Sequence, residues 1–222
     1  MELERNPTAR RLLKKLLDLE DKMVGKPFPG MRRVKQISVY ACGPATLEML
    51  FSFVGLKVSQ TLLIRSIRAQ NKIKLYGIDV NDMAKAAGIA GKKKFSFWRK
   101  QKSSLNDLYL IVNKYKYPVG VEWQGVFYEN EDEDSGHYGI ITKVDKKSGF
   151  LRIADPFFNG FFGYGDVDRK FKISQFLKKW WDTNEVKVAG TSKTRTVKDI
   201  RMIFLVTPKD SVFPKNLGMT RS

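Results

Sequence analysis

The spacing of hydrophobic residues changes along this chain from a helical period in the first half to a period of two in the second half. Before residue 115, apolar residues recur every three to four positions, which is typical of helices that bury one face. The expected helices cover residues 8–23, 44–54, 59–69 and 104–114, with a further helix capped by Asp79. The first half of the chain is therefore expected to be helical.

Alternating apolar and polar positions then predict an antiparallel sheet. The expected strands cover residues 119–123, 137–144, 150–154 and 200–206, with a short helix at 173–181. The turn-forming residues 145–149 join the second and third strands into a hairpin. Because helices come first and strands later, the order predicts an α+β fold, with an N-terminal helical part packed on an antiparallel sheet.

The chain is expected to have one main domain with two extensions. Residues 1–25 form an amphipathic N-terminal helix extension, residues 26–207 the domain, and residues 208–222 a loose C-terminal tail. The apolar residues that share one face of the N-terminal helix are Leu12, Leu13, Leu16, Leu17 and Met23. We expect this face to pack on the domain, and binding to a membrane surface is the alternative.

Charge adds a second possible partner. Lysine and arginine outnumber acidic residues 41 to 23, which gives a formal net charge of +18. Such a charge attracts polyanions, either nucleic acid or an anionic membrane. The basic residues are spread along the chain without a nucleic-acid-binding motif, so a solvated lysine-rich surface is the simpler interpretation.

The chain has one cysteine and one histidine, which limits the disulfides and metal sites that it can form. A single cysteine forms no internal disulfide, so a reducing compartment is favoured and we expect the protein to be cytoplasmic. No apolar run approaches the roughly 20 residues of a membrane-spanning helix, so no transmembrane segment is expected. One Cys and one His do not supply the usual four ligands of structural zinc, and we expect no metal and no cofactor.

Cys42 stands immediately before the Gly43-Pro44 pair that opens an expected helix. The N-terminus of a helix presents unpaired N–H donors and the positive end of its dipole. Both favour the thiolate, which is the nucleophilic form of cysteine. Read alone, Cys42 could equally be a small buried apolar residue.

His137 and Asp155 are expected to meet at the open end of the hairpin. We expect Val144 to pair with Phe150, which places Asp155 opposite Gly139. Asp155 and His137 are then diagonal neighbours on one face, with backbones about 7–8 Å apart. The imidazole could act as a base for a cysteine nucleophile, and the carboxylate could orient it.

Gln36 precedes Cys42 by six positions. A glutamine amide in this place could donate to a developing oxyanion together with the backbone N–H of Cys42. Read alone, it is an ordinary polar residue. The acidic stretch 129–134 shortly before His137 is expected to be a loop whose negative charge favours the imidazolium.

These residues resemble the motifs of a known family. The segments that carry the resemblance are Gln36 with Cys42-Gly43-Pro44-Ala45, Gly77-Ile78-Asp79, Tyr117-Pro118-Val119, Gly136-His137-Tyr138 and Ile153-Ala154-Asp155-Pro156. Their order resembles the double-glycine (bacteriocin-processing) peptidases and their stand-alone relatives, over about residues 30–207. The resemblance implies a papain-like fold, a Cys42–His137–Asp155 triad and Gln36 in the oxyanion hole.

The resulting hypothesis is a cysteine peptidase that hydrolyses a peptide or isopeptide bond in a peptide or protein substrate. An amidase or transamidase with the same triad is the first alternative, because the acyl-enzyme is common to both. A non-catalytic, polyanion-binding module on a papain-like scaffold is the second, because a fold does not establish activity.

Overall fold

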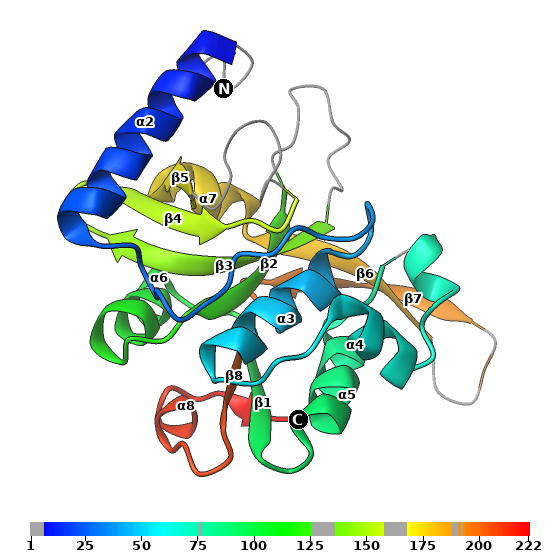
Figure 1. Ribbon diagram of the computed structural model, residues 1–222. Helices are drawn as coiled ribbons and strands as arrows, with labels where there is room; N and C mark the ends of the chain where they lie inside the picture. The colour runs from blue at the N-terminus through cyan, green and yellow to red at the C-terminus, as the bar shows by residue number, and fades with distance from the viewer. Residues whose placement is uncertain (1–6, 76, 126–135, 158–167, 188–190, 192) are drawn as a thin grey trace.

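The computed structural model describes residues 7–75, 77–125, 136–157, 168–187, 191 and 193–222. The acidic stretch 129–134 lies outside the described residues. The described part has helices on both faces of an antiparallel sheet, and this confirms the α+β class predicted from the order of periodicities. Figure 1 shows α3, α4 and α5 grouped on one side of the sheet.

Within the described ranges, seven strands form the main sheet in the order β5-β4-β3-β2-β8-β1-β9. Their bounds are β1 Phe95–Lys100, β2 Val119–Gln124, β3 Gly136–Asp145, β4 Phe150–Ala154, β5 Arg169–Lys172, β8 Ile203–Pro208 and β9 Thr220–Arg221. A separate two-stranded ribbon pairs β6 (Trp181–Lys187) with β7 (Thr194–Ile200). Neighbouring strands are antiparallel throughout. The sequence pattern predicted β2, β3, β4 and β8 and missed the others.

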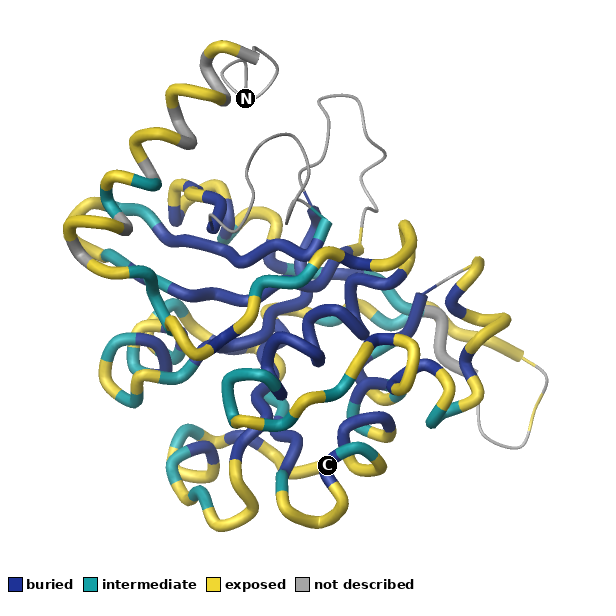
Figure 2. Tube along the Cα trace, viewed as in Figure 1, coloured by how far each residue is buried: buried dark blue, intermediate teal, exposed yellow. Residues whose placement is uncertain are grey.

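The helices divide between the two sheet faces. One group comprises α3 (Cys42–Phe53), α4 (Gln60–Ser66), the 3₁₀ turn η1 (Lys72–Lys74) and α5 (Val80–Gly91), and the other comprises α6 (Leu105–Tyr109), the π-helical turn η2 (Leu110–Lys114) and α7 (Ile173–Lys179). Each group buries its apolar residues against the sheet in a separate hydrophobic cluster. Because the central strands are covered on both faces, they are buried along nearly their whole length (Figure 2).

Side-chain caps explain where these helices begin. Ser59, Asp79 and Ser104 each accept a hydrogen bond from a backbone N–H in the first turn of α4, α5 and α6. Such caps satisfy donors that have no partner within the helix. The expected starts of all three helices are therefore confirmed.

The β3–β4 hairpin contains a correction to the predicted register. Phe150 pairs with Asp145 rather than with Val144. A bulge at Thr142 then inserts one extra residue into β3, so that Ile140 pairs with Ala154. One bulged residue shifts the register by one. The bulge thus restores, at the open end of the hairpin, the alignment that the sequence argument had assumed.

The N-terminal helix leaves three residues of the expected packing face exposed, Leu12, Leu16 and Met23, and the side chains of Leu13 and Leu17 lie outside the described residues. α2 (Pro7–Val24) projects from the body of the protein (Figure 1), and Leu12, Leu16, Leu19 and Met23 are exposed. Glu20 joins the helix to the sheet through ion pairs with Lys143 and Arg152. Helical periodicity shows that a face is apolar but does not show what covers it, and this explains the error.

The expected loose C-terminal tail is also wrong. Residues 213–216 form the short helix α8 (Phe213–Asn216), and β9 pairs with β1. Met219 is buried, and the Ser222 N–H donates to the Phe97 carbonyl at 2.9 Å. A two-residue strand carries too little alternation to be recognised in a sequence. No helix in the described ranges is both long and apolar enough to cross a membrane.

Candidate active site

Cys42 is the first residue of α3, and its side chain is largely buried. Ala41 precedes it as the cap residue and supplies no side-chain hydrogen bond. The first N–H groups of the helix therefore have no capping oxygen and remain directed toward the region in front of Cys42. Gly43 packs so closely on α5 that a Cβ atom there would lie 3.0 Å from Ile78 and 3.2 Å from the Met83 sulfur. Glycine at this position lets the two helix N-termini approach.

His137 and Asp155 meet at the open end of the hairpin. His137 is the second residue of β3, and Asp155 directly follows β4. The His137 Nε2 atom lies 2.8 Å from Asp155 Oδ1, and both side chains are buried. The other ring nitrogen, Nδ1, is then the one left for Cys42, whose side chain lies close enough to His137 to raise the pKa of the imidazole. The structure thus brings these three predicted residues together.

Electrostatics favour the ionised forms of His137 and Asp155. Burial alone would lower the pKa of His137, but the charge and hydrogen bond of Asp155 and the hydrogen bond with Cys42 raise that pKa to about 10. Burial would raise the pKa of Asp155, but His137 and Arg169 together lower it to about 2. Paired charges stabilise each other more strongly where water is excluded. The arrangement therefore holds an imidazolium next to the thiol of Cys42.

Arg169 is a further part of this arrangement that sequence reasoning missed. Its Nη1 atom donates to Asp155 Oδ2 at 2.8 Å, and its guanidinium lies 4.6 Å from the centre of the Phe171 ring. The Phe157 N–H donates to Asp155 Oδ1 at 3.0 Å. The carboxylate is therefore held from several sides. The alternation Arg169-Lys-Phe171-Lys in β5 was the available signal, because it places the arginine on the same face as a buried phenylalanine.

Gln36 lies near this group, but its amide is occupied. Its backbone N–H donates to the Pro156 carbonyl at 2.9 Å, next to Asp155. Its side-chain Nε2 donates to the carbonyls of Ser38 and Val39, at 2.8 and 2.6 Å. Both amide hydrogens are thus used to hold the loop that leads into Cys42. The structure brings Gln36 close to the site without presenting a free donor there.

A second buried carboxyl, Glu122, was also missed. It lies opposite Tyr138 in the β2–β3 ladder and accepts a hydrogen bond from the Tyr138 hydroxyl at 2.5 Å. Asn184 Nδ2 bridges Glu122 and Asp199, at 3.1 and 3.0 Å. Burial and the charge of Asp182 raise the pKa of Glu122 well above its usual range. A glutamate inside the apolar strand Val-Gly-Val-Glu-Trp-Gln was the signal that could have drawn attention to it.

Asp182 connects this acidic network to the strand that carries His137. A Cβ atom on Gly136 would lie only 2.5 Å from both carboxylate oxygens of Asp182. Gln124 Nε2 donates to the same carboxylate at 3.0 Å. Glycine immediately before His137 therefore leaves room for the Asp182 carboxylate, which a larger residue would have to displace.

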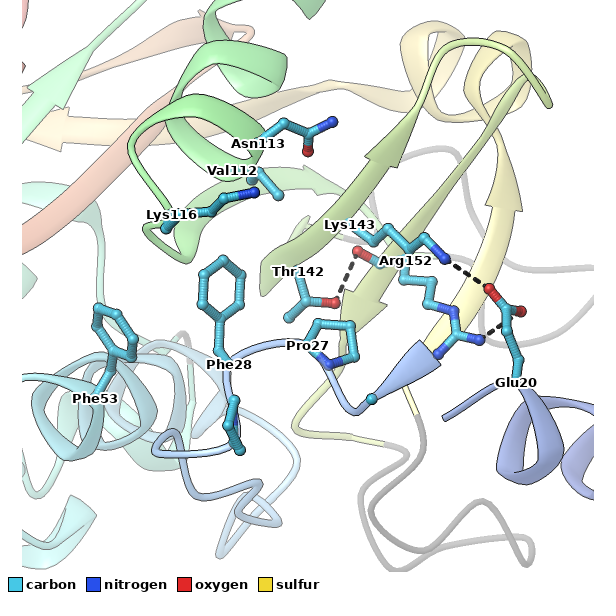
Figure 3. Close-up of a pocket in the computed structure, with 12 residues that line it drawn as sticks. Glu20, Pro27, Phe28, Phe53, Val112, Asn113, Lys116, Thr142, Lys143 and Arg152 are labelled. Carbon is cyan, nitrogen blue, oxygen red and sulfur yellow. Dashed lines mark hydrogen bonds and ion pairs between the residues drawn. The ribbon is translucent and has the colours of Figure 1, made fainter. Parts of the chain in front are cut away.

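Other features of the described residues lie away from this constellation. A cavity of about 350 Å³ lies at the C-terminal end of α2 (Figure 3). A second cavity, of about 390 Å³, lies beside the β6–β7 ribbon. Neither is lined by Cys42, His137 or Asp155. Within the described ranges, no group of three or more His, Cys, Asp or Glu side chains is arranged to hold a metal ion.

The comparison with protein families agrees with the motif analysis. The model of the Peptidase_C39-like family matches residues 27–188. A solved structure with 19% identity is the peptidase domain of Streptococcus ComA, a bi-functional ABC transporter involved in quorum sensing; the match covers 79% of this chain and 96% of that one, with a TM-score of 0.49. Another solved structure, with 15% identity, is a double-glycine-motif protease from an AMS/PCAT transporter in complex with the leader peptide. This match covers 80% of the present chain and 91% of the other chain, with a TM-score of 0.46. No curated protein matches the chain.

Proposed function

Because this chain belongs to the Peptidase_C39-like family, we propose that it is a cysteine peptidase with Cys42 as nucleophile, His137 as acid and base, and Asp155 as the residue that orients His137. The family assignment confirms the resemblance found in the sequence motifs. The observation that carries the proposal is the buried contact of His137 with Asp155 on one side and Cys42 on the other. A nucleophile, a base and a group that orients the base are the parts that covalent acyl transfer requires.

The reaction proceeds through an acyl-enzyme. The Cys42 thiolate attacks the carbonyl carbon of the substrate, and the negative charge moves to the carbonyl oxygen. The His137 imidazolium then gives its proton to the leaving amine as the C–N bond breaks. In the second half, neutral His137 takes a proton from water, the hydroxide adds to the thioester, and the thiolate leaves. Asp155 keeps its charge throughout and stabilises the imidazolium.

The oxyanion requires donors close to Cys42. The backbone N–H of Cys42 at the start of α3 is one, and the positive end of the helix dipole supports it. Gln36 becomes the second donor if its amide turns away from the Ser38 and Val39 carbonyls. We therefore expect substrate binding to reorganise the loop 38–41.

Labelling tests the proposal most directly. Iodoacetamide should alkylate Cys42 faster than it alkylates a free thiol at pH 6, and His137→Ala should remove this advantage, because the imidazolium then no longer stabilises the thiolate. Incubation with a peptide library, followed by mass spectrometry, should yield new termini with the native protein and none with Cys42→Ala. Slow alkylation of the native protein, with no cleavage, would overturn the proposal.

Gln36→Ala separates the two roles open to that residue. If Gln36 donates to the oxyanion, the variant should lose about 10²-fold or more in turnover while its alkylation rate stays near that of the native protein. If it only holds the loop, alkylation and turnover should change together.

An amidase or transamidase with the same residues remains the alternative, because the acyl-enzyme reacts with either water or an amine. Mass spectrometry of the products formed with and without an added primary amine distinguishes hydrolysis from transamidation, because a transamidase incorporates the amine in preference to water. Release of ammonia from a side-chain amide identifies an amidase. A polyanion-binding module without turnover would instead bind nucleic acid in a salt-sensitive manner and leave Cys42 unlabelled. The expected cytoplasmic location stays a prediction.

A further inference from the structure

α2 carries an exposed apolar row that nothing in the described part of the protein covers. Leu12, Leu16, Leu19 and Met23 follow one another at intervals of four, three and four residues, and they therefore share one helix face. Between 52% and 84% of each side chain is exposed. A row of large apolar side chains in water is unfavourable, and such faces mark places of interaction.

A row of cations runs beside this apolar row. Arg11, Lys15 and Lys22 are exposed, and each immediately precedes one of the exposed apolar residues. Neighbouring positions on a helix lie about 100° apart, so the cations flank the apolar face instead of interrupting it. The first three turns of α2 contain no acidic residue. Long basic side chains beside an apolar face can reach anionic groups while the apolar atoms are buried.

The attachment of α2 leaves this face free. Glu20 contacts Lys143 and Arg152 at 2.7 and 2.6 Å, and Figure 3 shows these contacts at the edge of the cavity beside the end of the helix. Gly25 follows the helix with a φ of +86°, and a Cβ atom there would meet nothing within 4 Å. Among the described side chains of α2, Glu20 thus attaches the helix to the sheet, and Glu20 lies outside the exposed row.

We propose that α2 binds the surface of an anionic lipid membrane, with Leu12, Leu16, Leu19 and Met23 inserted at the level of the acyl chains and the flanking cations on the lipid phosphates. Interfacial helices combine these two features, a narrow apolar face and basic flanks. The net charge of +18 adds attraction to a negative surface. A second copy of the chain is disfavoured as the partner, because it would bring an identical row of cations and the same net charge against the first.

Co-sedimentation with vesicles tests this proposal on the full chain. The protein should bind vesicles of phosphatidylcholine mixed with phosphatidylglycerol, and bind vesicles of phosphatidylcholine alone much more weakly. Leu12→Ser, Leu16→Ser and Leu19→Ser combined should lower the partition coefficient by about tenfold or more, because three apolar side chains no longer insert. Arg11→Gln, Lys15→Gln and Lys22→Gln combined should lower binding to the anionic vesicles only.

A matched control is available on the body of the protein. Leu62, Leu75 and Ile89 are 54% to 61% exposed and lie outside α2, so replacing these three with Ser should leave vesicle binding unchanged. Circular dichroism of each variant checks that the fold persists. The proposal is wrong if the native protein does not bind anionic vesicles, or if the α2 leucine variant and the control variant bind equally well. It is equally wrong if light scattering shows a dimer that the α2 leucine variant dissolves, or if DNA competes for binding that the leucines do not affect.

Discussion

Asp155 and Glu20 are both carboxylates placed between two cationic groups, but one is buried in the candidate active site and the other lies at the edge of the protein. Asp155 contacts His137 and Arg169 with no exposed surface, whereas Glu20 is 30% exposed and contacts Lys143 and Arg152. The pKa of each carboxyl is lowered to about 2. Similar pKa values therefore arise in environments where loss of a partner has very different consequences.

Burial decides the difference. When one partner of a buried pair is removed, water cannot reach the remaining charge to take the place of the lost partner. The free energy of unfolding then falls by about 3–5 kcal/mol. A fully exposed pair is worth about 0–1 kcal/mol because water replaces the lost partner. Glu20 lies between these limits, because its own side chain is 30% exposed while its partner Arg152 is buried. Under the proposed function, the arrangement at Asp155 stabilises the charges of the catalytic residues, while the contacts of Glu20 attach α2 to the sheet.

Asp155→Asn should have the largest effect. The amide removes the charge that raises the pKa of His137, so the imidazolium should lose its proton at a lower pH. We expect turnover to fall about 10²-fold or more and the upper limb of the Cys42 alkylation profile to move to lower pH.

Asp168→Asn is the matched control for this change. Asp168 is a buried carboxyl that pairs with Arg33 and accepts a hydrogen bond from Thr142, so its described contacts are with these residues and not with His137. Its loss should lower stability without moving the alkylation profile. If both variants shift the profile equally, Asp155 has no particular electrostatic role.

Arg169→Gln should have the next largest effect, and mainly on stability. Asp155 Oδ2 would lose its buried cation, and the free energy of unfolding should fall by about 3 kcal/mol or more, measured by urea denaturation. Arg169→Lys should restore part of the loss. If Arg169 also positions Asp155 for catalysis, the glutamine variant should shift the pH profile of alkylation, whereas Arg33→Gln, at the other buried Arg–Asp pair, should not.

The pH dependence of stability should show a third, smaller effect. The pKa of His137 is raised in the folded protein to about 10, from an ordinary value of 6.5. Its contribution to stability is therefore complete below pH 6.5 and is lost as the pH rises toward 10. Urea denaturation between these values should show falling stability, with a flatter slope in Asp155→Asn. An unchanged slope in that variant would contradict the assignment.

Glu20→Gln should have the smallest effect. We expect a loss of about 1 kcal/mol in domain stability, near the upper end for exposed pairs, because Glu20 is partly exposed while its partner Arg152 is buried. Amide hydrogen exchange in α2 should also become faster. The pKa of Glu20 is lowered from 4.5 to about 2, so the native contact should be intact above pH 4.5 and lost as the pH falls toward 2. A loss comparable to that of Arg169→Gln would remove the contrast between the two sites.

Local patterns predicted the elements that rely on sequence neighbours. The hairpin brought His137 and Asp155 onto adjacent strand ends even though the assumed pairing of Val144 was off by one residue. The bulge at Thr142 corrected this offset. The alternation of apolar residues in the sequence does not predict such a bulge. The Asp79 cap and the helix starts at Ser59 and Ser104 were found because the signals at a helix start act within one turn.

The features that the sequence did not reveal depend on distant contacts. Arg169 reaches Asp155 only because β5 pairs with β4 across a long connection. Glu122 becomes a buried acid because the β6–β7 ribbon covers it with Asn184 and Asp199. The α2 leucines were expected to be buried because the apolar face of the helix was assumed to pack on the domain. In each case the sequence did not show which distant residue or surface each side chain would contact.

The short pairing of β9 with β1 also has a consequence for solubility. β1 is bonded to β8 along one side, and β9 and the Ser222 N–H satisfy part of its other side. An uncovered strand edge presents rows of unpaired N–H and C=O groups, on which another chain can assemble. By pairing with β1, the two exposed residues of β9 cover part of this edge and thereby hinder the addition of a strand from another molecule.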